Sequence, residues 1–228
     1  MISSSGKPKS ASIRWIWNGK QYNLPISAED ILMLARAVQE EGYPQEGVAW
    51  ALLQRVAWLN TTGTPYKLGK LVQDYAQPIN PEWFPTGKKH QAEVLRLKEA
   101  GDFQEAQAEV NRAARRPAKA ARSWESLNTE TQNVIRRIMS GASKSPVPGA
   151  VHYWASRGPD FATNQAKKPG MILLDRGYGF GPGRNVFFAV KGSEKFGGLR
   201  IDSGSQGFPW GSLAIAVGGF IAFKIWKG

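Results

Sequence analysis

The sequence predicts an α+β fold that is mainly α, and three observations support this prediction. Helical patterns fill most of the chain from Ser27 to Gly141, because apolar residues recur there at three- and four-residue spacing. Alternating residues on both sides of Asn18-Gly19 predict a β-hairpin with a type I′ turn. Its aromatic side is expected to pack on the domain, the alternative being a face that stacks on nucleic acid or sugar. After Gly141 the pattern changes to short β-prone runs between Gly- and Pro-rich loops, which predicts a small C-terminal β region.

The first helix contains one carboxylate where an apolar side chain is expected. Ser27 is a good N-cap, and Glu41 is the next position on an apolar stripe made of Ile31, Leu34, Ala35 and Val38. Glu40 lies about 100° round the helix and is expected to face water. Gly42 is expected to end the helix, so partial burial and the helix dipole should raise the pKa of Glu41. Such a carboxyl can act as a general acid on a glycosidic oxygen, whereas a frayed helix end would leave it in solvent.

Two further helical segments and a stiff loop follow. A second helix is expected from about Gln45 to Leu59, packed on the first, and a short helical segment from Leu68 to Asp74. This segment leads into a loop that two prolines stiffen. Trp83 and Phe84 come just after the loop. Their rings are expected either to line a carbohydrate groove, where aromatic rings stack on sugars, or to lie in the core.

Residues 86–122 are rich in Ala, Glu, Lys and Arg and contain few large apolar residues. This composition predicts a helical hairpin that turns at Gly101 and ends at Arg116-Pro117. Its basic end, Arg112 to Arg122, is expected to be a solvated face or a contact for virion components or nucleic acid. A further amphipathic helix, capped by Asn128 or Thr129, is expected to end at Gly141.

The composition of the 228 residues excludes several classes of function. The absence of cysteine excludes disulfides and a thiolate nucleophile, and two histidines, His90 and His152, are too few for a His-rich metal centre. We therefore expect no cofactor and no metal. The formal charge of +12 requires an anionic partner, for which nucleic acid, wall polymers and lipid headgroups all qualify. The N-terminal residues contain no apolar run and do not form a secretory signal.

An uncharged apolar run from Leu213 to Phe223 distinguishes the C-terminus. A helix from Trp210 to Trp226 would span about 25 Å, which is short of the roughly 30 Å hydrocarbon core of a bilayer. The run is therefore expected to be a marginal membrane span or a buried helix. Its tryptophan and lysine flanks favour membrane contact.

Five short segments share an order and spacing with one known family. They are residues 34–42 (LARAVQEEG), 47–56 (GVAWALLQRV), 75–81 (YAQPINP), 149–155 (GAVHYWA) and 183–188 (GRNVFF). Together they resemble the SleB-type cell wall hydrolases, lysozyme-like enzymes of spore-forming bacteria and phages that cleave peptidoglycan. The resemblance covers roughly residues 27–85 and 145–192. Two positions depart from the family pattern, because Gln54 stands where Asn is usual and Asn185 where His is usual.

The resemblance implies a lysozyme-like fold, with Glu41 as the catalytic acid. The implied partner is a peptidoglycan glycan strand, cut at the β-1,4 bond between N-acetylmuramic acid and N-acetylglucosamine. Hydrolysis ordinarily needs two carboxylates. The matched segments offer no second one, Asp74 and Glu82 being the best candidates, so a lytic transglycosylase is favoured over a muramidase. Seven residues are implied to bind substrate: Gln54, Tyr75, Gln77, Asn80, His152, Tyr153 and Asn185.

These observations predict four parts of the chain. Residues 1–26 form a basic lead and the β-hairpin, 27–192 the lysozyme-like catalytic domain with the basic helical insertion 86–122, 193–209 a linker, and 210–228 an apolar helix that is a candidate membrane anchor. Small size, an N-terminus without a secretory signal and the apolar tail suggest, by analogy, a phage protein that acts from the virion or in the host cell envelope (periplasm or cell wall) during entry or lysis. The alternative is a non-catalytic basic virion or envelope protein that binds nucleic acid or membrane.

Overall fold

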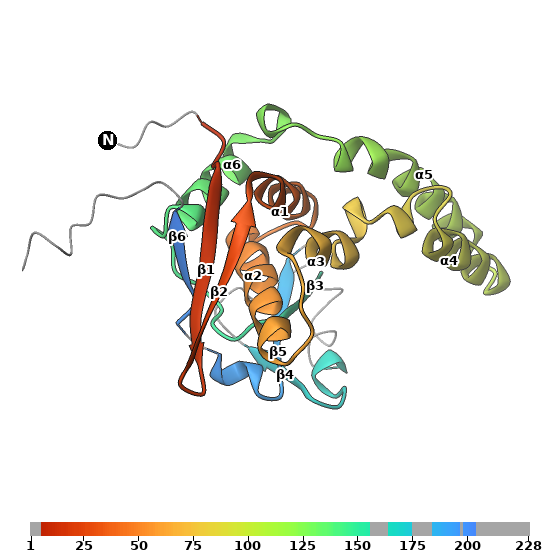
Figure 1. Cartoon of the computed structure of the whole chain (residues 1–228). Helices are drawn as coiled ribbons and strands as arrows, with labels where there is room; N and C mark the ends of the chain where they lie inside the picture. Colours follow the sequence, from red (N-terminus) through yellow and green to blue (C-terminus); the bar gives the residue numbers. More distant parts are fainter. Residues whose placement is uncertain (1–5, 156–163, 175–183, 197, 204–228) are drawn as a thin grey trace, which may run out of the picture.

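The computed structural model describes residues 6–155, 164–174, 184–196 and 198–203. This part of the chain is α+β and mainly α, as the sequence predicts, and its strands form two antiparallel sheets, β2-β1-β6 and β3-β5-β4 (Figure 1). The helices are α1 (Ala28–Glu40), α2 (Gln45–Thr61), α3 (Leu68–Tyr75), α4 (Lys88–Glu99), α5 (Phe103–Ala120) and α6 (Thr129–Met139). The strands are β1 (Ser10–Trp17), β2 (Lys20–Ser27), β3 (His152–Ala155), β4 (Met171–Leu174), β5 (Asn185–Val190) and β6 (Arg200–Ser203). Short 3-10 turns include η1 (Gln77–Ile79), η2 (Pro81–Trp83) and η4 (Ser193–Lys195).

The N-terminal hairpin forms as predicted. β1 pairs with β2 along its whole length, and Asn18 and Gly19 have φ values of 49° and 75°, the left-handed values that a type I′ turn needs. Trp15 is buried and donates a hydrogen bond from Nε1 to Thr61 Oγ1 of α2 at 2.9 Å. The aromatic side of the hairpin therefore packs on the domain.

The prediction that residues 193–209 form a linker is wrong for the part of this range that the structure describes. β6 pairs with β1, with Ile201 opposite Ile13, and so adds a third strand to the hairpin sheet. Phe196 is also buried and packs against Trp17 and Trp58. The sequence pattern does not reveal this, because a strand of four residues is too short to show a reliable alternation of apolar and polar positions.

The expected apolar helix at the C-terminus lies outside the described residues, which end at Ser203. Within the described ranges, no helix has both the length and the apolar character that crossing a membrane requires. Membrane contact through Leu213 to Phe223 stays a prediction from the sequence.

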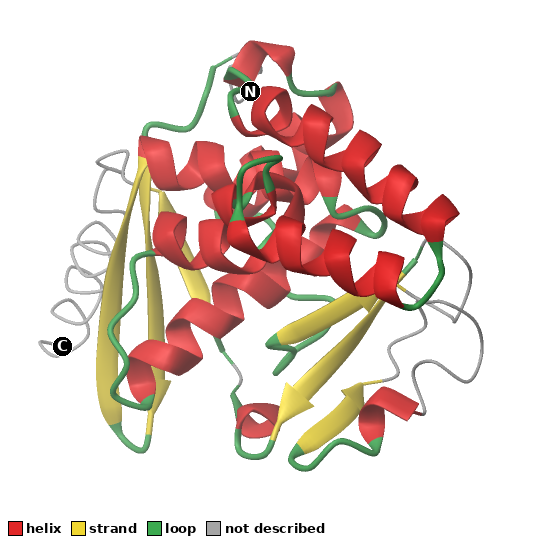
Figure 2. Cartoon of the chain, turned by 90° about the vertical axis from the view of Figure 1, so that its right-hand side faces the viewer, coloured by secondary structure: helices red, strands yellow, loops and turns green. Residues whose placement is uncertain are grey.

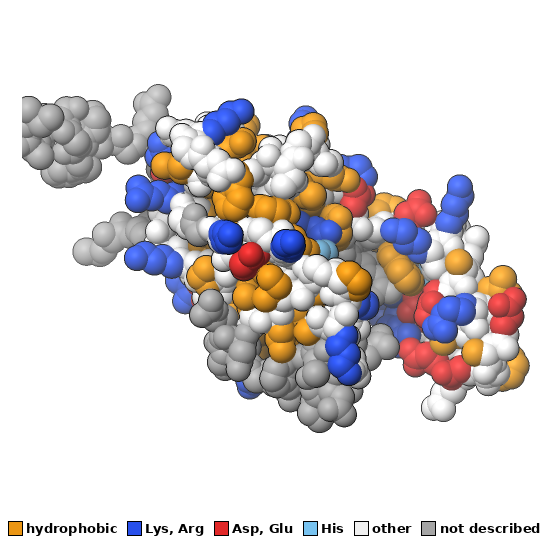
Figure 3. All heavy atoms as spheres, turned by 90° about the horizontal axis from the view of Figure 1, so that it is seen from below, with side chains coloured by type: hydrophobic (Ala, Val, Ile, Leu, Met, Phe, Trp, Pro, Cys, Tyr) orange, Lys and Arg blue, Asp and Glu red, His pale blue; other side chains and the backbone are white. Residues whose placement is uncertain are grey.

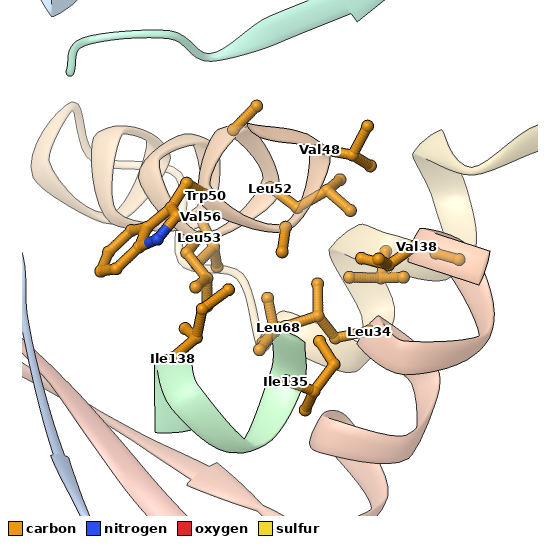
Figure 4. Close-up of a cluster of buried hydrophobic side chains, with 14 of the residues drawn as sticks. Leu34, Val38, Val48, Trp50, Leu52, Leu53, Val56, Leu68, Ile135 and Ile138 are labelled. Atoms are coloured by element: carbon orange, nitrogen blue, oxygen red, sulfur yellow. The ribbon is translucent and has the colours of Figure 1, made fainter. Parts of the chain in front are cut away.

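The core is built around α2, which lies between the two sheets and under the other helices (Figure 2). Apolar side chains from α1, α3 and α6 converge on it (Figure 4). α1 begins with the predicted N-cap, since Ser27 Oγ accepts a hydrogen bond from the Asp30 N–H at 3.1 Å. Asp30 Oδ1 in turn accepts one from the Gly69 N–H at 2.8 Å, which ties α3 to α1. The side chains labelled in Figure 4 are Leu34, Val38, Val48, Trp50, Leu52, Leu53, Val56, Leu68, Ile135 and Ile138.

The basic insertion forms the predicted helical hairpin of α4 and α5, turning at Gly101, whose φ is 75°. The predicted end at Arg116-Pro117 is wrong, because α5 continues through Pro117 to Ala120. The ion pair from Lys119 Nζ to Glu40 Oε2, at 2.6 Å, lies just after the proline and holds this last turn against α1. A tertiary contact thus overrides the helix-breaking preference of proline.

Glu40 does not face water as the helical wheel predicts. Its side chain is largely buried between Lys119 and Arg122, with which it forms ion pairs. Arg112 and Arg116, earlier in the same basic segment, pair with acids of α5 itself. Acidic and basic side chains are accordingly interspersed over the hairpin surface (Figure 3). Four of the five cations expected to form a basic patch therefore have carboxylate partners within the described part of the chain.

We predict that Leu53→Ala lowers the free energy of unfolding by about 2–5 kcal/mol, because Leu53 on α2 is fully buried and its truncation leaves a cavity. Urea denaturation followed by circular dichroism measures the change. The matched control is Leu95→Ala on α4, where the side chain is 58% exposed and the change should stay within about 0.5 kcal/mol. Equal, small losses at both positions would contradict the position of α2 in the core.

Candidate active site

A pocket of about 650 Å³ opens where the end of α1, the middle of α2, the α3–η2 loop and β3 meet. Its lining combines one carboxyl with aromatic rings and polar groups, a composition typical of a site that orients a polar ligand against apolar surfaces. The lining residues are Glu41, Leu52, Arg55, Tyr75, Gln77, Trp83, Val151, His152, Tyr153, Trp154 and Gln165.

The backbone of Glu41 is fixed from two sides. Its N–H donates to the Ala37 carbonyl at 2.9 Å, which closes the last turn of α1, and its own carbonyl accepts from Asn185 Nδ2 at 2.7 Å. The next residue, Gly42, has φ of 89°, a conformation that residues with a Cβ rarely adopt, so the chain can leave the helix there. Glu41 is thus held at the pocket wall by α1 and by β5.

Burial raises the pKa of Glu41 to about 7. The backbone N–H of Gln77 and the hydroxyl of Tyr153 favour the carboxylate and act against burial, whereas the negative charge of Glu40 adds slightly to the rise. Burial and the neighbouring Glu41 raise the pKa of Tyr153 well above its ordinary value, so this hydroxyl stays protonated. At neutral pH the Glu41 carboxyl therefore exists in both the protonated and the ionised form.

Arg55 and His152 form a second polar group in the pocket. Arg55 Nη1 donates to the Val151 carbonyl at 3.0 Å and lies 2.5 Å from His152 Nδ1, while the guanidinium stacks 3.5 Å above the ring of Tyr75. Burial, together with the charge of Arg55, lowers the pKa of His152 to about 4. His152 is therefore neutral at physiological pH and can accept the hydrogen bond from Arg55.

Three polar atoms of this pocket are buried without a hydrogen-bond partner among the described residues. They are Arg55 Nε, Tyr153 Oη and Gln165 Oε1. The Tyr153 hydroxyl lies close enough to Glu41 to influence its pKa, but the contact does not reach hydrogen-bond geometry. Buried polar groups in proteins are nearly always satisfied, so a cluster of unsatisfied ones in a pocket marks where a ligand binds.

The structure brings five of the predicted site residues together in the pocket: Glu41, Tyr75, Gln77, His152 and Tyr153. The aromatic ring of Trp83, for which the sequence left groove and core open, also lines it. Glu41 is the one carboxyl in the pocket among the described residues. The predicted cluster therefore exists as a single concave site.

The other three predicted substrate-binding residues do not line the pocket, and their side chains are buried against the backbone. Gln54, Asn80 and Asn185 are 2%, 3% and 1% exposed. Gln54 binds the Val147 and Ala150 carbonyls and the Gly149 N–H, Asn80 binds the Asp74 carbonyl and the Glu82 N–H, and Asn185 binds the Glu41 carbonyl. Each holds a piece of backbone that forms the pocket wall, because its amide group is used up by main-chain partners.

Sequence reasoning did not identify Arg55, Trp154 and Gln165 as site residues. Arg55 follows Gln54 directly and lies in the segment 47–56, one of the segments that resemble the SleB-type hydrolases. Trp154 is two residues after His152 on β3, and its ring stacks on that of His152 with centroids 5.5 Å apart. Gln165 has no pattern around it that would have pointed to the pocket.

Comparisons of the chain with protein-family models, with curated proteins and with solved structures found no match. Within the described residues, no group of three or more His, Asp or Glu side chains is arranged to hold a metal ion. The residues of the pocket and their geometry are thus the observations from which a function can be proposed.

We predict that Glu41→Gln becomes increasingly stable relative to the unmodified chain as the pH rises. The pKa of Glu41 is about 7 when folded and 4.5 when exposed. The stability that its bound proton contributes is therefore fully present below pH 4.5 and is lost as the pH rises through 7. The total loss in the free energy of unfolding is about 3 kcal/mol. Urea denaturation of both proteins from pH 4.5 to pH 8 measures the difference, and a constant difference would contradict the burial of the carboxyl.

Proposed function

We propose that this chain cleaves the glycan strands of peptidoglycan, with Glu41 donating and then accepting a proton. The observation that supports this most directly is the state of Glu41: a carboxyl in a pocket, without a cationic partner among the described residues and with a pKa of about 7. A general acid works best when its pKa lies near the operating pH. The backbone N–H of Gln77 favours the carboxylate that proton donation leaves behind.

The pocket lining fits an N-acetylated sugar. Tyr75, Trp83 and Trp154 offer aromatic surfaces, on which the apolar face of a sugar ring can stack. Tyr153 Oη is an unsatisfied donor and Gln165 Oε1 an unsatisfied acceptor, and an acetamido group needs one of each, for its carbonyl and its N–H. Peptidoglycan carries an acetamido group on every sugar, so these groups support the substrate class that the sequence resemblance implies.

A lytic transglycosylase reaction is the form of the proposal that needs one carboxyl. Glu41 protonates the glycosidic oxygen as the bond from the anomeric carbon breaks, then removes the proton of the substrate's own 6-hydroxyl, whose oxygen closes a 1,6-anhydro ring on that carbon. The two acids considered as a second carboxylate do not line the pocket. Asp74 pairs with Lys70, and Glu82 is an exposed residue of η2.

The lysozyme-like character of the fold and a place of action in a phage virion or in the host cell envelope belong to the same proposal. They rest on the segments that resemble the SleB-type hydrolases, in which a helix ending in the catalytic Glu is followed by a second helix. The order of α1, Glu41, Gly42 and α2 fits that pattern. A purely binding role through the basic segment is less well supported, because most of its cations are paired within the chain.

Glu41→Gln is expected to fold and to lose about 10²- to 10⁴-fold in the rate of peptidoglycan cleavage, because the amide keeps the shape and cannot transfer the proton. Release of soluble fragments from purified peptidoglycan measures the rate. The matched control is Glu82→Gln, which changes a carboxyl outside the pocket. The neighbouring residue Glu40 is unsuitable as a control, because its substitution would also break the ion pair with Lys119. Retained activity in Glu41→Gln, or its loss in the Glu82 variant alone, would refute the assignment.

The products distinguish the two reactions. Digestion in oxygen-18 water should release fragments that end in 1,6-anhydro-N-acetylmuramic acid and contain no heavy oxygen, since water takes no part in transglycosylation. Mass spectrometry of the end groups measures this. Reducing ends that contain oxygen-18 would show that water is the nucleophile and would require a second carboxylate to activate it.

A further inference from the structure

Arg55 is a largely buried cation that makes no ion pair with any carboxylate in the described part of the chain. Its guanidinium contacts the Val151 carbonyl, the ring of His152 and the face of Tyr75, all of them neutral groups. Burial lowers the pKa of Arg55, although an arginine stays charged in proteins. Buried charges are normally paired, because desolvation without a partner is costly. An unpaired cation in a pocket therefore points to an anionic group on the ligand.

The hydrogen bonds of Arg55 leave one edge of its guanidinium unused. The bonds to protein use Nη1, which fixes the group against β3. Nε is buried without a partner, and Nη2 makes no hydrogen bond to the described residues. Nε and Nη2 form the edge through which arginine binds a carboxylate with two parallel hydrogen bonds. The unused edge is thus suited to a planar carboxylate.

The other titratable groups that line the pocket leave this charge uncompensated. Glu41 is protonated below about pH 7, and His152 is neutral above about pH 4. Between pH 4 and pH 7, Arg55 therefore carries the only formal charge among the described residues that line the pocket. A ligand with one carboxylate would neutralise this charge.

Resting on the proposed function, we propose that Arg55 binds the free lactyl carboxylate of N-acetylmuramic acid, so that the chain cleaves glycan strands without stem peptides faster than strands that carry them. In intact peptidoglycan this carboxyl is bound to the peptide as a neutral amide. In strands that have lost the peptide it is an anion. The reaction that must supply the substrate is therefore hydrolysis of the amide bond between the lactyl group and the first amino acid of the stem.

The direct test compares two matched substrates with the unmodified chain. One is a peptide-free glycan strand, and the other is the same strand with its lactyl carboxylates converted to methylamides. The expected kcat/KM is higher for the carboxylate strand by about tenfold or more, the usual effect of losing a charge-assisted hydrogen-bond pair. Equal values for the two strands would overturn the inference and leave the proposed function standing.

Variants provide a second measurement of the same preference. Arg55→Gln should bring the ratio of the two kcat/KM values close to one, whereas Arg96→Gln, which removes an exposed cation of α4, should keep it. A preserved ratio in Arg55→Gln would overturn the inference. If Arg55→Gln fails to fold, because Nη1 also holds Val151 and His152, the comparison of substrates on the unmodified chain decides alone.

A sugar titration separates failure of this inference from failure of the proposed function. If neither strand is cleaved, the proposed function fails, and binding is then followed by NMR with N-acetylmuramic acid and with its carboxamide as probes. Tighter binding of the acid, by about tenfold, would still support the carboxylate site. Equal binding of the two sugars, or binding of neither, would overturn it.

Discussion

The site depends on keeping one carboxyl out of water at the end of a helix. Burial favours the neutral form of Glu41, and the structure fixes the backbone around the residue without pairing the side chain with a cation among the described residues. Asn185 binds the Glu41 carbonyl, and the Asn185 N–H donates to the Tyr43 carbonyl at 2.8 Å, so β5 holds both sides of the turn that follows α1. Since α2 starts directly after this turn, the same contacts set the position of Arg55 relative to Glu41.

The α4–α5 hairpin stabilises two walls of the pocket from outside. Lys119 pairs with Glu40, the residue next to Glu41, and Arg116 Nη1 donates to the Trp83 carbonyl at 2.6 Å. The guanidinium of Arg116 also lies 5.6 Å from the centre of the Trp83 ring. The sequence predicts a solvated basic element here. In the structure the insertion instead stabilises the pocket wall, and most of its basic side chains form ion pairs within the chain.

Local patterns predicted the parts of the fold that depend on neighbouring residues. The Ser27 N-cap, the Asn18-Gly19 turn and the Gly101 turn follow from short-range chemistry, and the apolar stripe of α1 pointed to Glu41, which lines the pocket. What failed depends on partners distant in sequence. Gln54 and Asn185 were expected to reach the substrate, but main-chain groups 93 to 144 residues away occupy their amides. Sequence spacing cannot show which partner a buried polar side chain meets.

The contrast between two buried carboxyls shows why Glu41 and not Glu109 is the candidate acid. Burial alone would raise the pKa of Glu109, but hydrogen bonds from Arg116 and Arg112 outweigh it and lower the pKa. Glu109 is therefore ionised and fully used in holding α5 together. Glu41 meets a backbone N–H and a hydroxyl in place of cations, and its pKa stays near 7. Two side chains with the same chemistry thus differ in pKa, because cations surround one of them and the other faces an open pocket.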